Sequence, residues 1–516
     1  GLAAAGLLQS LGGDPADRTI GAMAGLRVTL LADLDRPADA ARALEEARRR
    51  FGDIPLSALG EPLDAPALRA RFESRLAALR RLPEIGAPIR EEQPQLLPGY
   101  VLRPVAFSPE TEGGPGRVGT DAVLVVAPGG GSLSCYAPTG DGPPGEGPLE
   151  ARWSRAIETE PLLLRIEGGS ALLAYPHRSR TAFERIDLAS GETAWRSTAW
   201  DELIRDRGLG RARARRTAMA GNVDDTALTL TLDGRTLAVV ERTGIGAAID
   251  VATGRVRWVA ELPIGGVTDA DVRGGLLALA GTDTAGQPVW MGVDVRTGEP
   301  IVSDRTGASA VEWVRVTGTG QIVHATGSRI VSHDPYQRRE NWSHAGAFVG
   351  PSTRAWPLPG AMLLGTLEGG PRFLLADAAT GVLTGPLDTR DRLGPRDGLR
   401  VMPSGDGLIL AGDDAILAYD REGRIVGEDV LDTVGSLVPP VLTAERVVTV
   451  EIAPRGFGLR GAGHRLHLFD RDTMDLQRTL PLRLLGEPTA VSAIDGYLLI
   501  SAAESVVVVR SPADAP

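Results

Sequence analysis

Residues able to carry redox, metal or nucleophilic chemistry are sparse in this 516-residue sequence, which holds one cysteine, Cys135, and six histidines. A single cysteine excludes a disulfide framework and a cysteine-rich metal site. The histidines nearest to each other in sequence, His464 and His467, are three residues apart, which places them on opposite faces of a strand. We interpret both as ordinary strand histidines and predict no catalytic residue, no bound cofactor and no metal ion.

Other short motifs also point away from known catalytic loops. The glycines at 129–131 and 168–169 are not followed by Lys-Ser or Lys-Thr, so they predict turns and not phosphate-binding loops. Neither Gly-x-Ser-x-Gly nor His-Glu-x-x-His occurs. Asn341-Trp342-Ser343 fits a glycosylation sequon, which we interpret as a chance match within a strand.

One charged stretch is a candidate interaction site. Six arginines fall within twelve residues: Arg205, Arg207, Arg211, Arg213, Arg215 and Arg216. The simpler interpretation is a solvated insertion loop. The alternative is a docking site for an acidic partner or an anionic surface.

Composition limits the class of protein. Hydrophobic residues make up 43% and charged residues 23%, which is ordinary for a globular chain that buries a core. The formal net charge of -11 argues against nucleic-acid binding. No run of about 18 apolar residues predicts a transmembrane helix. Because the chain starts at Gly1 without a methionine or a leader, we expect a fragment or processed product, with any membrane anchor upstream.

The first 82 residues have the apolar spacing of helices. Leu30, Leu31 and Leu34 form one apolar stripe, and Leu44 lies on a second. Asp35-Arg36-Pro37 separates the two stripes, which predicts a helix, a tight turn and another helix. This stretch resembles about one tetratricopeptide unit. We therefore predict an α-helical, tetratricopeptide-like segment over 1–82, joined by a proline-rich linker over 83–98.

A repeat fills the remaining 99–511, leaving a C-terminal tail over 512–516. The cleanest copies have an apolar strand that ends in Asp, then Gly four residues later and Trp eight residues after the Asp. The other copies lose the Gly or the Trp, or are one residue shorter. The residues that mark the copies are Asp187, Gly191, Trp195, Asp250, Gly254, Trp258, Asp294, Gly298, Asp334, Trp342, Asp377, Gly381, Asp420, Gly423 and Asp470. Intervals of mostly about 40 residues with about four short strands each are typical of a closed β-propeller of four-stranded blades.

The motif has a structural explanation. A strand-end Asp can accept hydrogen bonds from the N–H groups of the following turn, and Gly supplies a position of positive φ. A Trp on the next strand is large and flat enough to cover a seam between sheets. A catalytic residue would not be needed once in every repeat, so we interpret these residues as structural.

The Asp–Gly–Trp pattern resembles the PQQ-like, or quinoprotein-type, β-propeller repeat. That family includes quinone-dependent alcohol dehydrogenases and non-catalytic relatives, among them the eight-bladed outer-membrane assembly lipoprotein of the β-barrel assembly machine. The resemblance favours eight blades, although strand pairs in the sequence number nine and seven to nine blades stay open. A strand over Tyr100–Phe107 is expected to close the ring.

The family's dehydrogenases use vicinal cysteines and a calcium ion held partly by amide side chains. Cys135 is alone, and Asn222 and Asn341 are the only asparagines, so the resemblance does not imply dehydrogenase activity here. We predict a non-catalytic scaffold that binds other proteins, in the cell envelope or periplasm of a bacterium. The alternatives are a quinoprotein-like oxidoreductase and a ligand-sensing propeller of a larger membrane or signalling protein.

Overall fold

Most of the repeat region is described by the computed structural model. The described residues are 25, 28, 57–58, 61–62, 95–103, 122–139, 148–167, 169–176, 181–220, 227–307, 309–327, 329–346, 353–358, 360–366, 372–389, 400–404, 407–412, 415–420, 422–430, 437–442, 446–452, 464–471, 473–482, 487–494, 497–502 and 504–510. The predicted helical segment falls almost entirely outside them. Before residue 95 they include helical Gly25 and Val28 and a short pair of strands, β1 (Ser57–Ala58) and β2 (Glu61–Pro62).

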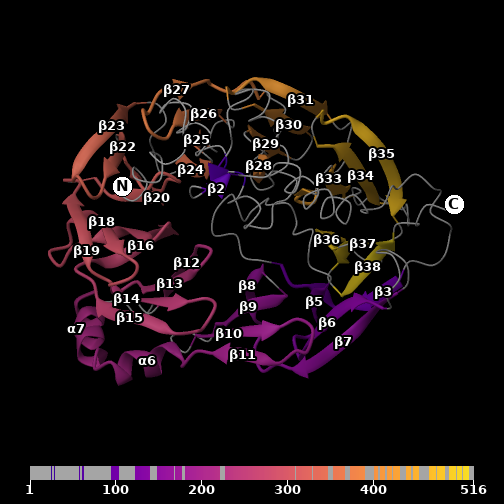
Figure 1. The fold of residues 1–516 in the computed structure, drawn as a ribbon, viewed down its shortest axis with the longest axis horizontal. Helices are drawn as coiled ribbons and strands as arrows, with labels where there is room; N and C mark the ends of the chain where they lie inside the picture. Colours follow the sequence, from indigo (N-terminus) through magenta and orange to yellow (C-terminus); the bar gives the residue numbers. More distant parts are fainter. Residues whose placement is uncertain are drawn as a thin grey trace.

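Nine four-stranded antiparallel sheets follow one another around a ring, as Figure 1 shows. We number these blades in chain order. Blade 1 is β4 (Tyr100–Val101), β5 (Val123–Val126), β6 (Ser132–Pro138) and β7 (Leu149–Ala156). Blade 2 is β8 (Leu162–Glu167), β9 (Ser170–Tyr175), β10 (Ala182–Asp187) and β11 (Thr193–Arg196). Blade 3 is β12 (Leu228–Leu232), β13 (Thr236–Glu241), β14 (Ile245–Asp250) and β15 (Val256–Glu261).

The next three blades have the same strand order. Blade 4 is β16 (Gly265–Arg273), β17 (Leu276–Thr282), β18 (Pro288–Asp294) and β19 (Pro300–Arg305). Blade 5 is β20 (Val311–Val316), β21 (Ile322–Thr326), β22 (Arg329–Asp334) and β23 (Arg339–Ala345). Blade 6 is β24 (Thr353–Leu358), β25 (Ala361–Thr366), β26 (Arg372–Asp377) and β27 (Leu383–Thr384).

The last three blades complete the ring. Blade 7 is β28 (Arg400–Ser404), β29 (Gly407–Ala411), β30 (Ala415–Tyr419) and β31 (Ile425–Val430). Blade 8 is β32 (Val441–Leu442), β33 (Arg446–Glu451), β34 (His464–Asp470) and β35 (Leu476–Leu482). Blade 9 is β36 (Pro488–Ile494), β37 (Tyr497–Ala502), β38 (Ser505–Arg510) and β3 (Gln95–Pro98).

The ring is closed by strand β3, which comes from the start of the described ring and forms the outermost strand of blade 9. It pairs antiparallel with β38, with Leu97 opposite Val506. The next residues pass into β4, the innermost strand of blade 1. First and last blades are thereby joined by the same stretch of chain, and the outer edge of β38 is paired.

These findings confirm a propeller of four-stranded blades and correct two details. The ring has nine blades, as the strand pairs indicate, and not the eight that the resemblance favours. The closing strand is β3 and not Tyr100–Phe107, whose first two residues form β4. The last four residues of the predicted linker therefore belong to the ring. Among the described residues, no helix is long and apolar enough to cross a lipid bilayer.

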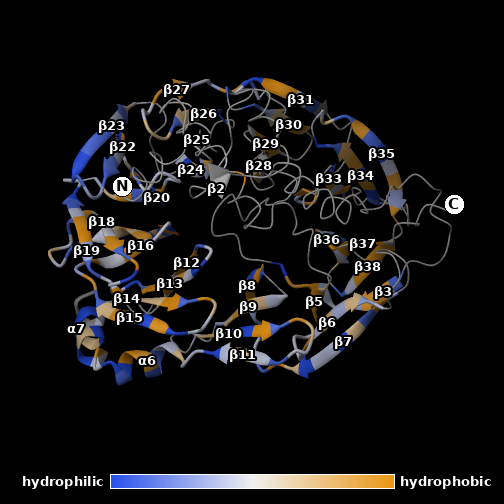
Figure 2. Cartoon of the chain, in the orientation of Figure 1, coloured by the Kyte–Doolittle hydropathy of each residue, from blue (hydrophilic) through white to orange (hydrophobic). Residues whose placement is uncertain are grey.

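Burial explains why the strands form. The two middle strands of each blade pack against neighbouring sheets on both faces, so they are almost continuous apolar runs. All six residues of β13 and all six of β37 are buried. Outer strands such as β7 and β19 are largely exposed and polar. Figure 2 shows β23, another outer strand, largely in the colour of hydrophilic residues.

The repeat motif joins neighbouring blades. The indole N–H of Trp258 in blade 3 donates to the carbonyl of Val295 in blade 4 over 2.7 Å. The same indole ring lies against Gly298, where an added Cβ would come within 2.7 Å of it. The equivalent bonds are Trp153 to Leu188, Trp195 to Val251 and Trp342 to Ala378. Each of these four tryptophans covers a seam between two blades.

The turns of the motif share one geometry. The Asp250 carboxylate accepts the N–H of Thr253 over 3.0 Å, and Asp377 accepts those of Ala379 and Thr380. The residue four places after the Asp has positive φ even where it is not glycine, as at Arg338 and Met474. The tight turn is therefore conformationally fixed in copies that have lost part of the motif.

Candidate functional site

Two helices interrupt the ring between blades 2 and 3. They are α6 (Trp200–Asp206) and α7 (Gly210–Ala220), and they contain the arginine-rich stretch. We call residues 200–220 the arginine arm; Figure 1 shows it on the outer side of the ring beside β15. Buried Trp200, Leu203 and Ile204 pack into a core cluster shared with blades 2 and 3. The stretch is thus an ordered helical insertion and not the loop of the simpler interpretation.

Two arginines of α7 attach the arm to blade 3. Arg213 forms ion pairs with Asp201 of α6 and, over 2.6 Å, with Glu241 at the end of β13. The Glu241 side chain is fully buried and also accepts the hydroxyl of Thr243 over 2.8 Å. Burial raises the pKa of Glu241, and the positive charge of Arg213 opposes that shift.

Arg216 binds the backbone of the same blade. Its guanidinium donates to the carbonyl oxygens of Thr243, Leu262 and Ile264 over 2.6–2.8 Å. It also pairs with Glu261 over 2.8 Å. A guanidinium with this many acceptors fixes the direction of α7, because its planar fork satisfies several loop carbonyls at once.

The remaining arginines of the arm face solvent. Those with exposed side chains are Arg205, Arg207, Arg211 and Arg215. Arg215 also contacts Glu261 over 2.9 Å while its side chain stays 61% exposed. No ion pair is recorded for the other three within the described part of the chain. α6 exposes Glu202 and Asp206, whereas α7 contains no acidic residue.

Sequence reasoning identified these six arginines as one group, but the structure divides them. Arg213 and Arg216 are three positions apart on the face of α7 that meets blade 3. Arg211 and Arg215 are four positions apart on the face that meets solvent. The spacing of the arginines at helical intervals could have predicted this division. It was not used, because the stretch was interpreted as a loop.

His467 and Cys135 lie in structural contacts. The ring of His467 is within hydrogen-bond distance of Glu451 (3.2 Å) and Thr479 (3.0 Å). The Cys135 thiol is buried and donates to the carbonyl of Leu188 over 3.3 Å. Within the described ranges, no group of three or more His, Cys, Asp or Glu side chains could hold a metal ion.

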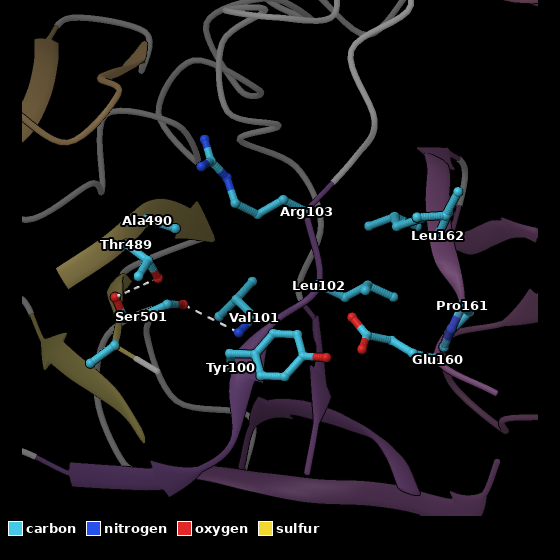
Figure 3. A pocket seen from close by; sticks show the side chains of 12 residues that line it. Tyr100, Val101, Leu102, Arg103, Glu160, Pro161, Leu162, Thr489, Ala490 and Ser501 are labelled. Carbon is cyan, nitrogen blue, oxygen red and sulfur yellow. Dashed lines mark hydrogen bonds between the residues drawn. The ribbon is translucent and has the colours of Figure 1, made fainter. Parts of the chain in front are cut away.

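A pocket that sequence reasoning missed lies where the ring closes. Its volume is about 480 Å³, and residues of blades 9, 1 and 2 line it. Figure 3 shows Tyr100, Leu102 and Glu160 on one side and Thr489 and Ser501 on the other. No sequence motif marks it, because its walls come from segments about 400 residues apart that only ring closure brings together.

Comparisons with known proteins found likenesses in structure alone. No protein-family model and no curated protein matches the chain. BamB from Moraxella catarrhalis is 16% identical over 66% of this chain and 93% of that chain, with a TM-score of 0.38. The computationally designed Ika8 protein is 14% identical over 67% and 94%, with a TM-score of 0.43. Saccharomyces cerevisiae Sqt1 is 12% identical over 67% and 93%, with a TM-score of 0.40. The propeller fold therefore rests on the chain's own sheet order.

Proposed function

We propose that this protein is a non-catalytic scaffold, built on a PQQ-like β-propeller, whose arginine arm binds an acidic segment of a protein partner. The observation that carries the proposal is that some arginines of the arm bind blade 3 while the others are exposed to solvent. Arg213 and Arg216 hold α7 rigidly on blade 3, and the exposed arginines are presented from that fixed base. A preorganised surface loses little conformational entropy when it binds.

The chemistry of arginine favours a carboxylate-rich partner. A guanidinium can form two parallel hydrogen bonds to one carboxylate. The arm is basic, whereas the whole protein has a net charge of -11. The negative charge of the rest of the surface disfavours binding of nucleic acid there. We further propose that a tetratricopeptide-like segment over 1–82 supplies a second interaction surface and that the protein acts in the bacterial envelope.

The test is direct binding of a fluorescent decaglutamate peptide, followed by anisotropy at low salt. We expect the triple variant Arg205→Ala, Arg207→Ala, Arg211→Ala to bind about tenfold more weakly, since exposed ion pairs contribute about 0.2–1 kcal/mol each. The matched control is Arg339→Ala, Arg354→Ala, Arg372→Ala, which removes three exposed arginines from blades 5 and 6. Equal weakening by both triples would show that net charge, and not the arm, controls binding.

The oxidoreductase alternative has its own measurement. The protein is incubated with pyrroloquinoline quinone and calcium, and dye-linked oxidation of an alcohol is followed. We expect no turnover above that of the free quinone, and turnover in the reconstituted protein would replace the scaffold proposal.

A further inference from the structure

The pocket where the ring closes, which we call the closure pocket, joins three blades. Val101 ends β4 and Leu102 follows it, while Thr489 and Ser501 belong to β36 and β37 of blade 9. Glu160 and Leu162 come from the start of blade 2. The backbone N–H of Val101 donates to the Ser501 hydroxyl over 3.2 Å, so blades 1 and 9 already meet at its floor.

The walls of the closure pocket are largely apolar. Leu102 is buried and Leu162 is 41% exposed, and Figure 3 shows both side chains lying toward the space between them. An exposed leucine on an innermost strand is unusual in this ring, where most large apolar side chains of the sheets are buried. A pocket of about 480 Å³ is large enough for a small organic molecule, since ligand sites span about 300–1,000 Å³.

Hydrogen-bond acceptors lie at one end of the closure pocket. Burial and the neighbouring Glu160 carboxylate raise the pKa of the Tyr100 hydroxyl, and Figure 3 shows that hydroxyl on the side of the ring nearest Glu160. Glu160 is exposed at the rim, and an ionised carboxylate offers about four acceptor sites. The phenol oxygen of Tyr100 can also accept a hydrogen bond. Figure 3 shows the Arg103 side chain extending away from Glu160.

We propose that the closure pocket binds a small organic amine, whose ammonium group is held by Glu160 and Tyr100 and whose apolar part packs between Leu102 and Leu162. An ammonium group supplies three donors and a positive charge, which matches a site of acceptors around one carboxylate. The hydrocarbon part removes the exposed leucine from water. An alcohol would satisfy the acceptors only in part, and a carboxylate would be repelled by Glu160.

A ligand in this position also joins two blades. It would contact blade 1 through Tyr100 and Leu102 and blade 2 through Glu160 and Leu162, and these contacts exist only in the folded propeller. Binding to the folded state alone raises the apparent stability by linkage. The amine should therefore raise the midpoint of thermal unfolding in proportion to its occupancy.

The experiment measures the thermal unfolding midpoint and the calorimetric affinity of the full chain with hexylamine, and with hexanol and hexanoate at the same concentration and pH. We expect hexylamine to raise the midpoint and the other two compounds to leave it nearly unchanged. Glu160→Gln should weaken hexylamine binding about tenfold or more, because it removes a charged acceptor. The matched control is Glu158→Gln, an exposed glutamate two residues away that does not line the pocket.

Two outcomes would overturn the proposal. One is an equal midpoint shift with hexanoate or hexanol, and the other is an unchanged hexylamine affinity in Glu160→Gln. Leu162→Ser tests the apolar half, because it should reduce the gain in affinity from butylamine to hexylamine. Far-ultraviolet circular dichroism of each variant shows whether the ring is intact before binding is compared.

Discussion

At the scale of single residues, the tryptophan of the Asp–Gly–Trp motif contacts the glycine of the next copy and not the glycine of its own copy. Trp258 and Gly254 belong to one repeat, but Trp258 packs on Gly298 of the next blade. Sequence spacing could predict the residue types and the turn, since both are local. It could not predict the partner, because spacing within a repeat does not say which sheet packs on which. Trp153 was not identified as a motif residue, because a glycine- and proline-rich stretch over 140–148 separates it from the turn of its own copy.

The seam between blades 4 and 5 lacks the tryptophan contact. Val302 stands at the Trp position, opposite Gly292 in the sheet. Two carboxylates of β16 instead accept N–H groups of β20: Asp269 from Val314 over 2.9 Å and Asp271 from Val316 over 2.7 Å. Hydrogen bonds between the innermost strands β16 and β20 thus take the place of the tryptophan contact made by the outer strand at other seams.

Asp271 gives the first prediction about stability. Burial raises its pKa, with Arg315 and the Val316 N–H opposing the shift. Because the folded pKa lies above the unfolded one, the stability linked to this group is full below the unfolded pKa. It is lost as pH rises through the folded pKa. Asp271→Asn keeps an oxygen acceptor without the charge, so it should be at least as stable as the parent at neutral pH and should lack this slope.

The measurement is urea unfolding from about pH 4 to about pH 8. Asp271→Ala is the comparison variant, because it leaves the Val316 N–H without its acceptor and should lose about 1–3 kcal/mol at every pH. A greater loss in Asp271→Asn than in Asp271→Ala would show that the charge itself holds the seam.

At the scale of elements, the strands were easier to predict from the sequence than the two helices of the arginine arm. Continuous apolar runs such as Leu237–Val240 identify buried strands directly. The arginine arm has low apolar content, and its helices depend on contacts with blade 3 that no local pattern reveals. β3 ends in Pro98, one of the four prolines over 83–98 that indicated a linker. As the outermost strand, it tolerates a residue that cannot donate to a further strand.

The arm depends on the pairing of Arg213 with buried Glu241. Arg213→Ala should lower the free energy of unfolding by about 3 kcal/mol, because it leaves a buried carboxylate without its partner. Arg211→Ala, on the solvent face of the same helix, should change it by less than about 0.5 kcal/mol. Denaturant midpoints of both variants check this, and Arg213→Ala with Glu241→Gln should recover part of the loss. Similar midpoints for Arg213→Ala and Arg211→Ala would mean that the buried pair does not anchor α7.

At the scale of the whole molecule, closure decides the blade count. The sequence contains nine strand pairs, but the resemblance to an eight-bladed relative led to a predicted number of eight blades. The last blade hides its outermost strand about 400 residues upstream, so counting motif copies along the chain cannot find it. The closure pocket was hidden for the same reason.

Leu97 tests closure directly. It is buried in a core cluster that includes Val101 and Val125 of blade 1 and Tyr497 and Val508 of blade 9. Its neighbour Leu96 lies on the opposite face of β3 and is 48% exposed. Leu97→Asp would bury an unpaired charge between the first and last blades, which costs at least about 3 kcal/mol, whereas Leu96→Asp should be nearly neutral.

Because every blade packs on two neighbours, the loss at this one seam should propagate around the ring. We therefore expect Leu97→Asp to lower the midpoint of a single cooperative transition and to increase proteolytic cleavage near the N-terminal side of β4. Leu96→Asp controls for the added charge. If both variants unfold like the parent, β3 does not hold the ring closed, and the first and last blades must be joined by their inner strands alone.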